Sequence, residues 1–209
     1  MASSGSAPMR ILVVCTGNIC RSPMGQAMLT ARMRAALGGD ASRLVEVTSA
    51  GTYGLTGYPI EPDAVSALAE LGVEPDDFAA RELVEEIVEE QDLVLTATRE
   101  HRAAAVSMMP RASRRTFTIR EFARLVEAVD VSTLDAGDPA EAGDPVERAR
   151  ALVDAAASQR GYVRAPSPAA DDVADPYRRS INAFRDAAQQ IDAATAVIAE
   201  RLAQVLAAG

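Results

Sequence analysis

The residues from Cys15 to Arg21 could bind and attack a phosphoryl group. The segment reads Cys-Thr-Gly-Asn-Ile-Cys-Arg, continues with Ser22 and Pro23, and directly follows the apolar run 11–14. That run is typical of a buried strand, and Pro23 favours the first turn of a helix. A turn of this kind can wrap backbone N–H groups around one phosphoryl group, and the helix dipole adds to the attraction. The sequence therefore predicts a phosphate-binding loop between a strand and a helix.

Each side chain of this loop has a chemical reason to be present. Amide dipoles and Arg21 favour the thiolate form of Cys15, which is the nucleophilic form. Arg21 also offers a planar fork of donors that matches two phosphoryl oxygens. Gly17 permits the backbone conformation of a tight loop, and Asn18 can hydrogen-bond neighbouring backbone. The Ser22 hydroxyl can donate to the cysteine sulfur and help it leave.

The loop resembles the signature of the low-molecular-weight protein tyrosine phosphatases, which reads Cys, any residue, Gly-Asn, any residue, Cys-Arg-Ser. Two later segments carry the same resemblance. Ser49-Ala50-Gly51-Thr52 matches the family's next recurring segment, with Tyr53 where an aromatic residue lines the pocket. Asp175-Pro176-Tyr177 matches the family's late Asp-Pro loop, which supplies the general acid. The likeness covers roughly three quarters of the chain.

The resemblance implies a set of functional residues. Cys15, Arg21 and Asp175 are the expected catalytic residues, and Ser49 is expected to support the loop. The residues expected to bind substrate are Thr16, Gly17, Asn18, Ile19, Cys20, Ser22, Tyr53 and Tyr177. We expect no metal and no other cofactor, because the loop amides and the arginine supply positive charge and no His or carboxylate cluster has ligand spacing.

Strand patterns alternate with helical patterns, which is typical of a parallel sheet covered on both faces. With the resemblance, this predicts an α/β fold: a three-layer sandwich with a central four-stranded parallel sheet. The expected strands lie at 11–14, 45–48, 93–96 and 116–119. The expected helices lie at 23–37, 62–71, 82–91, 100–109 and 180–206. Ligands in such sheets bind beyond the carboxyl ends of the strands, where Cys15 and Ser49 are expected.

Length and composition set limits on the function. A chain of 209 residues, 48% of them hydrophobic, can bury one core, so we expect a single phosphatase domain at 9–209 after a flexible tail at 1–8. The net charge of −9 disfavours a nucleic-acid partner. The two cysteines, both in the loop, favour a reducing cytoplasm, and no apolar stretch has the length of a membrane helix. We expect a cytoplasmic enzyme that acts on phosphorylated protein, with inorganic phosphate as product and inhibitor.

The segment at about 129–168 is longer than the family's usual link before the Asp-Pro loop. Within it, 145–159 has helical spacing. We expect a surface insertion, because long insertions cost little loop-closure entropy, and a lid over the pocket is the alternative. Asp-Pro occurs at Asp138, Asp144 and Asp175. Only the third is followed by an aromatic residue and the long last helix, so we assign the acid there and expect turns at the other two.

Cys20, His101 and Ser49 are each considered with their neighbours in the sequence. Cys20 is either a buried filler or the partner of Cys15 in a disulfide that protects the nucleophile from oxidation. His101 stands in a charged run and is expected at the surface. The family often has a His that bonds the serine of Ser-Ala-Gly, and Phe78 occupies that position here. We therefore expect Ser49 to lack this support.

The resemblance implies hydrolysis of phosphotyrosine through a phosphocysteine intermediate, with three alternatives. A related branch hydrolyses phosphoarginine and resembles this chain at 93–101, but it has Thr at the position of Ile19. The flat, apolar phenol suits Ile better than a polar phosphoguanidinium does. An arsenate reductase that uses an external thiol is the second alternative. A non-catalytic phosphate-binding module is the third, disfavoured because nucleophile, arginine, serine and acid are all present.

Overall fold

The computed structural model describes residues 7–135 and 144–207. Within them four parallel strands form one sheet in the order β2-β1-β3-β4. The strands are β1 (Met9–Cys15), β2 (Val45–Gly51), β3 (Leu93–Thr96) and β4 (Thr116–Thr118). The predicted α/β class and four-stranded parallel sheet are confirmed.

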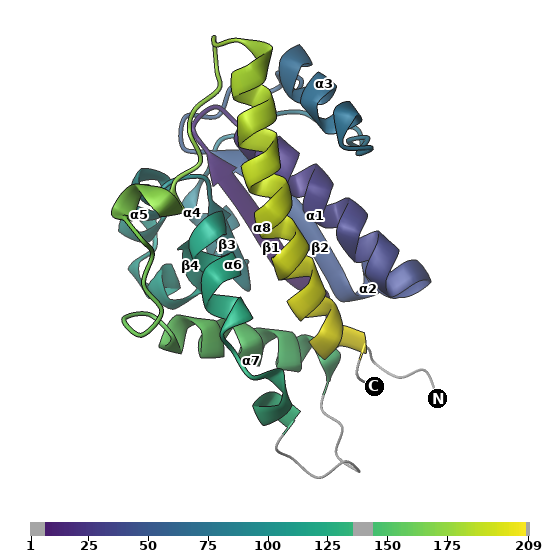
Figure 1. The fold of residues 1–209 in the computed structure, drawn as a ribbon, viewed down its shortest axis with the longest axis vertical. Helices are drawn as coiled ribbons and strands as arrows, with labels where there is room; N and C mark the ends of the chain where they lie inside the picture. The colour runs from purple at the N-terminus through teal and green to yellow at the C-terminus, as the bar shows by residue number, and fades with distance from the viewer. Residues whose placement is uncertain (1–6, 136–143, 208–209) are drawn as a thin grey trace.

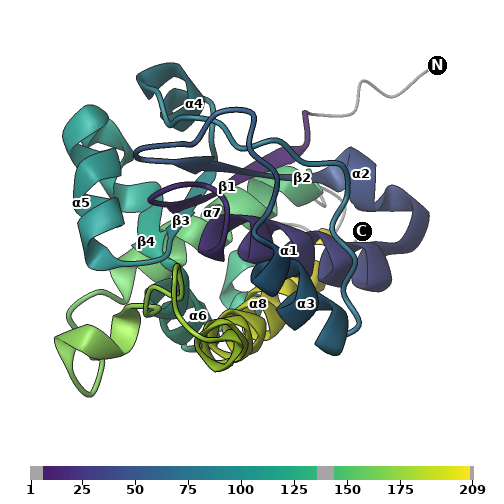
Figure 2. The ribbon, with the colours of Figure 1, turned by 90° about the horizontal axis from the view of Figure 1, so that it is seen from above.

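Helices cover both faces of the sheet, which makes the fold a three-layer sandwich (Figures 1 and 2). One face carries α1 (Arg21–Leu37), α6 (Ile119–Glu127) and α8 (Ile181–Ala207). The other face carries α4 (Glu85–Glu89) and α5 (Arg99–Met108). The remaining helices are α2 (Ala41–Leu44), α3 (Pro62–Glu70) and α7 (Pro145–Ser158). Short 3-10 turns lie at Gly38–Asp40, Pro110–Arg115, Val131–Asp135 and Pro168–Asp171.

The alternation of side chains along β1 divides the core in two. Ile11 points into the large core under α1, α6 and α8. Leu12 and Val14 point into a smaller core under α4 and α5. A strand that is buried on both faces reads as a continuous apolar run, which is the pattern seen in the sequence. No helix among the described residues is long and apolar enough to cross a membrane.

Two differences from the predicted elements have a clear physical cause. The helix expected at 82–91 is shortened to α4, because Leu83 donates its backbone N–H to the Gly51 carbonyl and so extends the sheet instead. The strand expected to end at 119 stops at Thr118, and α6 begins at the next residue. This helix was missed, although its capping box was readable: Thr118 accepts from the Glu121 N–H, and the Glu121 carboxylate accepts from the Thr118 N–H.

Helix α7 confirms the helical spacing at 145–159, but its location was predicted wrongly. Its apolar side lies in the large core through Val146, Ala149, Leu152, Val153 and Ala156. Arg150 of this helix contacts Asp92, the residue before β3, so α7 crosses the amino ends of the strands (Figure 1). It is therefore neither a surface insertion nor a lid over the carboxyl ends.

The structure describes one of the two aspartates, Asp138 and Asp144, at which turns were expected. Asp144 is the N-cap of α7 and accepts from the Val146 N–H, so it lies at the start of a helix. Asp138 lies outside the described residues, as does the tail at 1–6. Pro8 is half-buried at the start of β1.

We expect Leu152→Ala to lower the free energy of unfolding by about 2–5 kcal/mol, because it removes a fully buried side chain from the core. Leu71→Ala, at a residue 38% exposed beyond the end of α3, should cost much less and is the matched control. Urea unfolding measures both. Equal losses for the two variants would contradict the core position of α7.

Candidate active site

The predicted loop joins β1 to α1 at the carboxyl end of the sheet. Cys15 is the last residue of β1 and Arg21 is the first of α1, so a regular element holds each end. Three backbone N–H groups of the segment 52–55 donate to the carbonyls of Cys15, Thr16 and Gly17 at 2.9–3.0 Å. These bonds occupy carbonyls that would otherwise repel an anion. The free N–H groups at the start of α1 remain available to one.

The buried side chain of Asn18 holds the loop in shape. Its amide nitrogen donates to the hydroxyls of Ser22 and Ser49, both at 2.8 Å, and its oxygen accepts from the Arg81 N–H at 2.9 Å. Asn18 has a φ of 57°, in the left-handed region that asparagine tolerates better than most residues. Gly17 was expected to supply the unusual backbone conformation, and instead Asn18 adopts it.

Ser49 has the polar support that the sequence suggested was missing. Its hydroxyl donates to the Gln26 side-chain oxygen at 2.6 Å, and its carbonyl accepts from the Arg81 side chain at 2.8 Å. A glutamine from α1 thus replaces the expected histidine contact. Nothing in the sequence around Gln26 pointed to this role.

Gly51 lets β2 and the loop touch backbone to backbone. A Cβ at this position would lie 2.4 Å from the Thr16 carbonyl oxygen and 2.9 Å from the Asn18 nitrogen. No side chain fits that space. The glycine of Ser-Ala-Gly is therefore required by the close approach, and its φ is ordinary.

The two cysteines have different surroundings. The Cys15 sulfur lies 3.0 Å from the Ser22 hydroxyl, which matches the expected contact, and it lines a pocket. Both cysteines are free thiols in the structure. Burial and the neighbouring Cys15 raise the pKa of Cys20 to about 12, so this second thiol stays protonated at neutral pH.

Arg21 and Asp175 meet across the pocket. The buried Arg21 side chain donates to the Val173 carbonyl at 3.1 Å and forms an ion pair with Asp175 at 3.2 Å. Its Nε has no partner among the described residues, which leaves one guanidinium donor for an anion. The Asp175 side chain is half-exposed and accepts from the Tyr177 N–H. Of the two Asp-Pro aspartates that the structure describes, only Asp175 lines this pocket.

The pocket has a volume of about 190 Å³ and apolar walls above these polar groups. Its lining residues are Cys15, Thr16, Gly17, Ile19, Cys20, Arg21, Tyr53, Leu55, Asp175 and Tyr177. Tyr53 is 77% exposed and therefore stands at the rim. Leu55 was missed, and its sequence context carries no signal for it. Asn18, Ser22 and Ser49 are buried and absent from this lining, so their side chains support the loop from behind.

His101 is buried, so its expected surface position was wrong. Its Nε2 lies 2.8 Å from the Thr16 hydroxyl, and its Nδ1 lies 2.8 Å from the Thr98 hydroxyl. Burial and, to a lesser extent, Arg21 lower the pKa of His101 from 6.5 to about 4. The imidazole is therefore neutral at pH 7. Thr98, three residues before His101, is the N-cap of α5. This cap was the sequence signal that could have placed His101 in the first turn of that helix.

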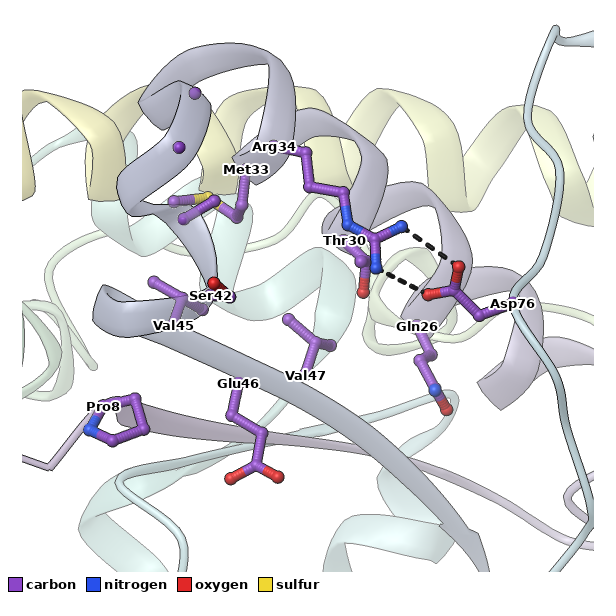
Figure 3. A pocket seen from close by; sticks show the side chains of 13 residues that line it. Pro8, Gln26, Thr30, Met33, Arg34, Ser42, Val45, Glu46, Val47 and Asp76 are labelled. Atoms are coloured by element: carbon purple, nitrogen blue, oxygen red, sulfur yellow. Dashed lines mark hydrogen bonds and ion pairs between the residues drawn. The ribbon is translucent and has the colours of Figure 1, made fainter.

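A larger hollow, of about 820 Å³, lies between α1 and the edge strand β2 (Figure 3). Its walls carry a bidentate ion pair between Arg34 and Asp76, and neither cysteine lines it. Gln26 lines this hollow and also binds Ser49. Among the described residues no three His, Cys, Asp or Glu side chains gather as a metal site would require. Cys15, Arg21 and Asp175 line the smaller pocket together.

The family model of the low molecular weight phosphotyrosine protein phosphatases matches residues 10–160. The chain belongs to this family. The matched segment contains the whole loop and ends before Asp175. The family match therefore does not include Asp175, and the structure supplies the separate observation that Asp175 lines the pocket.

Individual relatives agree with the family. A low molecular weight protein-tyrosine-phosphatase of Streptomyces coelicolor is 36% identical over 71% of this chain and 89% of its own. The probable phosphatase EpsP of Ralstonia solanacearum is 47% identical, but the match spans 41% of this chain and only 52% of EpsP. The YwlE arginine phosphatase structure from Geobacillus stearothermophilus superposes with a TM-score of 0.63 at 29% identity, covering 93% of each chain. The chain is thus a phosphatase with relatives named for two substrates.

His101 should make the phosphatase less stable in acid. Because its pKa is lower in the folded state, the unfolded chain binds the proton first, and stability is lost as pH falls from 6.5 toward 4. At about 1.4 kcal/mol per pH unit, the penalty reaches about 2 kcal/mol at pH 5. Wild type should therefore lose that much more stability than His101→Gln between pH 7.5 and pH 5 in urea unfolding. Parallel losses would contradict a neutral, buried imidazole.

Proposed function

We propose that this phosphatase hydrolyses phosphotyrosine in proteins through a phosphocysteine on Cys15. The observation that carries the proposal is the pocket itself, where a cysteine, an arginine and an aspartate lie beneath the apolar wall of Ile19. Tyr53 and Tyr177 stand at the rim, where a phenol ring would pass between them.

In the first step the Cys15 thiolate attacks phosphorus in line with the ester oxygen. The loop amides and Arg21 hold the other three phosphoryl oxygens, because these oxygens carry the charge of the transition state. A P–S bond forms while the P–O ester bond breaks, and Asp175 donates its proton to the leaving phenol oxygen. The contact between Ser22 and the sulfur supports the thiolate before and after this step.

In the second step Asp175, now a carboxylate, takes a proton from water. The water oxygen attacks phosphorus on the face that the phenol has left. The P–S bond breaks, inorganic phosphate is released, and the Ser22 hydroxyl donates to the departing thiolate. The released phosphate binds the same donors and should inhibit.

The apolar wall favours phosphotyrosine over phosphoarginine. Ile19 is buried, lines the pocket and offers no hydrogen-bond acceptor from its side chain. A phosphoguanidinium pressed against it would leave N–H groups unpaired, at about 1–3 kcal/mol each. A phenol ring has no such groups on its faces.

The setting of the enzyme follows from its charge and thiols. We place it in the cytoplasm, because a free nucleophilic cysteine persists in a reducing compartment. The net charge of −9 disfavours nucleic acid as a partner. We therefore propose phosphorylated proteins as its substrates.

Wild type should hydrolyse a phosphotyrosine peptide with at least about fivefold higher kcat/KM than a phosphoarginine peptide of the same sequence, since one unpaired N–H at about 1 kcal/mol accounts for that ratio. Ile19→Thr supplies a hydroxyl acceptor and should narrow or reverse the ratio. Cys15→Ser is the inactive baseline for both peptides. A wild-type preference for phosphoarginine would overturn the proposed substrate.

Asp175→Asn should lower kcat/KM for phenyl phosphate, a poor leaving group, by about 10²–10⁴-fold. The loss should be smaller for 2,4-dinitrophenyl phosphate, because its leaving group needs little protonation. Asp144→Asn is the matched control, since asparagine also caps a helix and the residue lies at the start of α7. Equal losses on both esters would remove Asp175 from the role of acid.

A further inference from the structure

The first turn of α5 touches both loops of the active site. His101 reaches the Thr16 hydroxyl at 2.8 Å, in the loop that carries the nucleophile. Arg99, two residues earlier, holds Asp172, three residues before the proposed acid Asp175. One helical turn thus contacts two loops: His101 contacts the loop that follows β1, and Arg99 contacts the segment that leads to Asp175.

The Arg99–Asp172 contact is unusually complete for a surface pair. The backbone N–H of Arg99 donates to one carboxylate oxygen at 2.8 Å, and its guanidinium donates to both oxygens at 2.8–3.2 Å. Although burial acts in the opposite direction, these bonds hold the pKa of Asp172 below its ordinary value. A carboxylate held by backbone and side chain together has little freedom to move.

Backbone bonds anchor this turn to the sheet. The Ala97 N–H donates to the Val14 carbonyl of β1, and the Ala97 carbonyl accepts from the Val173 N–H, both at 2.8 Å. The Val173 carbonyl in turn accepts from Arg21. The segment that leads to Asp175 is therefore registered against the same strand that ends in the nucleophile.

His101 faces charged groups as well as its two hydroxyl partners. Arg21, Asp175 and Asp172 act on it electrostatically, and the effect of the arginine is larger than that of either carboxylate. A neutral imidazole avoids repulsion with Arg21 and still bonds Thr16 and Thr98. Neither His101 nor Arg99 lines the pocket, so both can act only through the residues they hold.

We propose that the first turn of α5 sets the spacing between nucleophile and acid: His101 positions the phosphate-binding loop through Thr16, and Arg99 positions Asp175 through Asp172. Both are positioning residues. The proposal rests on the proposed function, because it takes Asp175 as the acid. Loss of the two contacts should have different effects. The His101–Thr16 contact supports the loop that binds the phosphoryl group, whereas the Arg99–Asp172 contact supports the segment that carries the proton donor.

Two variants of His101 separate positioning from simple filling of space. His101→Gln places an amide near the former Nε2, within reach of Thr16, whereas His101→Asn places one near the former Nδ1, within reach of Thr98 only. Loss of one hydrogen bond corresponds to about three- to tenfold. We expect Asn to lower kcat/KM by that factor for both aryl phosphates and to weaken inhibition by inorganic phosphate, with Gln closer to wild type. If His101→Asn is as active as His101→Gln at equal melting temperature, the proposal that His101 positions the loop through Thr16 is overturned.

Arg99→Gln tests the second contact. We expect kcat/KM to fall about three- to tenfold for phenyl phosphate and less than about twofold for 2,4-dinitrophenyl phosphate, because only the former needs the acid. Arg34→Gln is the matched control: it also breaks a bidentate arginine–aspartate pair, but in the last turn of α1, at the opposite end of that helix from Arg21, beside the hollow of Figure 3. If Arg99→Gln lowers kcat/KM equally for both esters, or if Arg34→Gln lowers it as much, the proposal that Arg99 positions Asp175 is overturned.

Failure of the proposed function would look different from failure of this proposal. If Asp175 is not the acid, Asp175→Asn lowers kcat/KM equally for phenyl phosphate and 2,4-dinitrophenyl phosphate. His101→Gln nevertheless stays more active than His101→Asn. If the physiological substrate is not phosphotyrosine, both arms still report on aryl phosphates. The proposal falls when Asp175→Asn behaves as an acid variant and Arg99→Gln shows no preference between the esters.

Discussion

The buried amide of Asn18 is the constraint on which the active site depends. Its side chain is inaccessible to water, and every one of its hydrogen bonds goes to a different part of the fold: Ser22 in α1, Ser49 in β2 and the backbone of Arg81. A buried polar group left without its partner costs about 1–3 kcal/mol. The loop, the helix and the strand can therefore satisfy this amide only in one mutual arrangement. That arrangement points the loop amides and the start of α1 at one position in space.

Positive potential at this position is local, because the protein as a whole carries a net charge of −9. It comes from the start of α1, the loop amides and Arg21, which lies buried and keeps one donor without a partner among the described residues. Asp175 offsets part of this charge through its ion pair with Arg21. A bound phosphoryl group would compete for that arginine and free the carboxyl group beside the leaving oxygen. In the proposed mechanism, the Arg21–Asp175 pair thus links occupation of the site to the placement of the acid.

The far end of the sheet serves stability. Helix α7 lies across the amino ends of the strands and adds its apolar side to the core that α1, α6 and α8 share. Arg150 of this helix binds Asp92, whose other carboxylate oxygen accepts from the Arg10 N–H at the start of β1. Chemistry gathers at the carboxyl ends and core packing at the amino ends. Parallel strands allow this division, because all their carboxyl ends meet at one edge.

Features that depend on neighbouring residues could be predicted from the order of amino acids. The strand, the loop and the helix that carry Cys15 and Arg21 are contiguous, so their order and spacing already defined the phosphate-binding loop. Alternation of strand and helix patterns likewise predicted the parallel sheet. The contacts that support the loop depend on the folded chain: Gln26 bonds Ser49, and His101 meets Thr16 across 85 positions of the chain. The Thr98 cap could place His101 in the first turn of a helix, but neither this histidine nor Gln26 carries a local signal that names its distant partner. Their roles arise when the sheet brings the ends of β1, β2 and β3 together, because partners so far apart in sequence become neighbours only there.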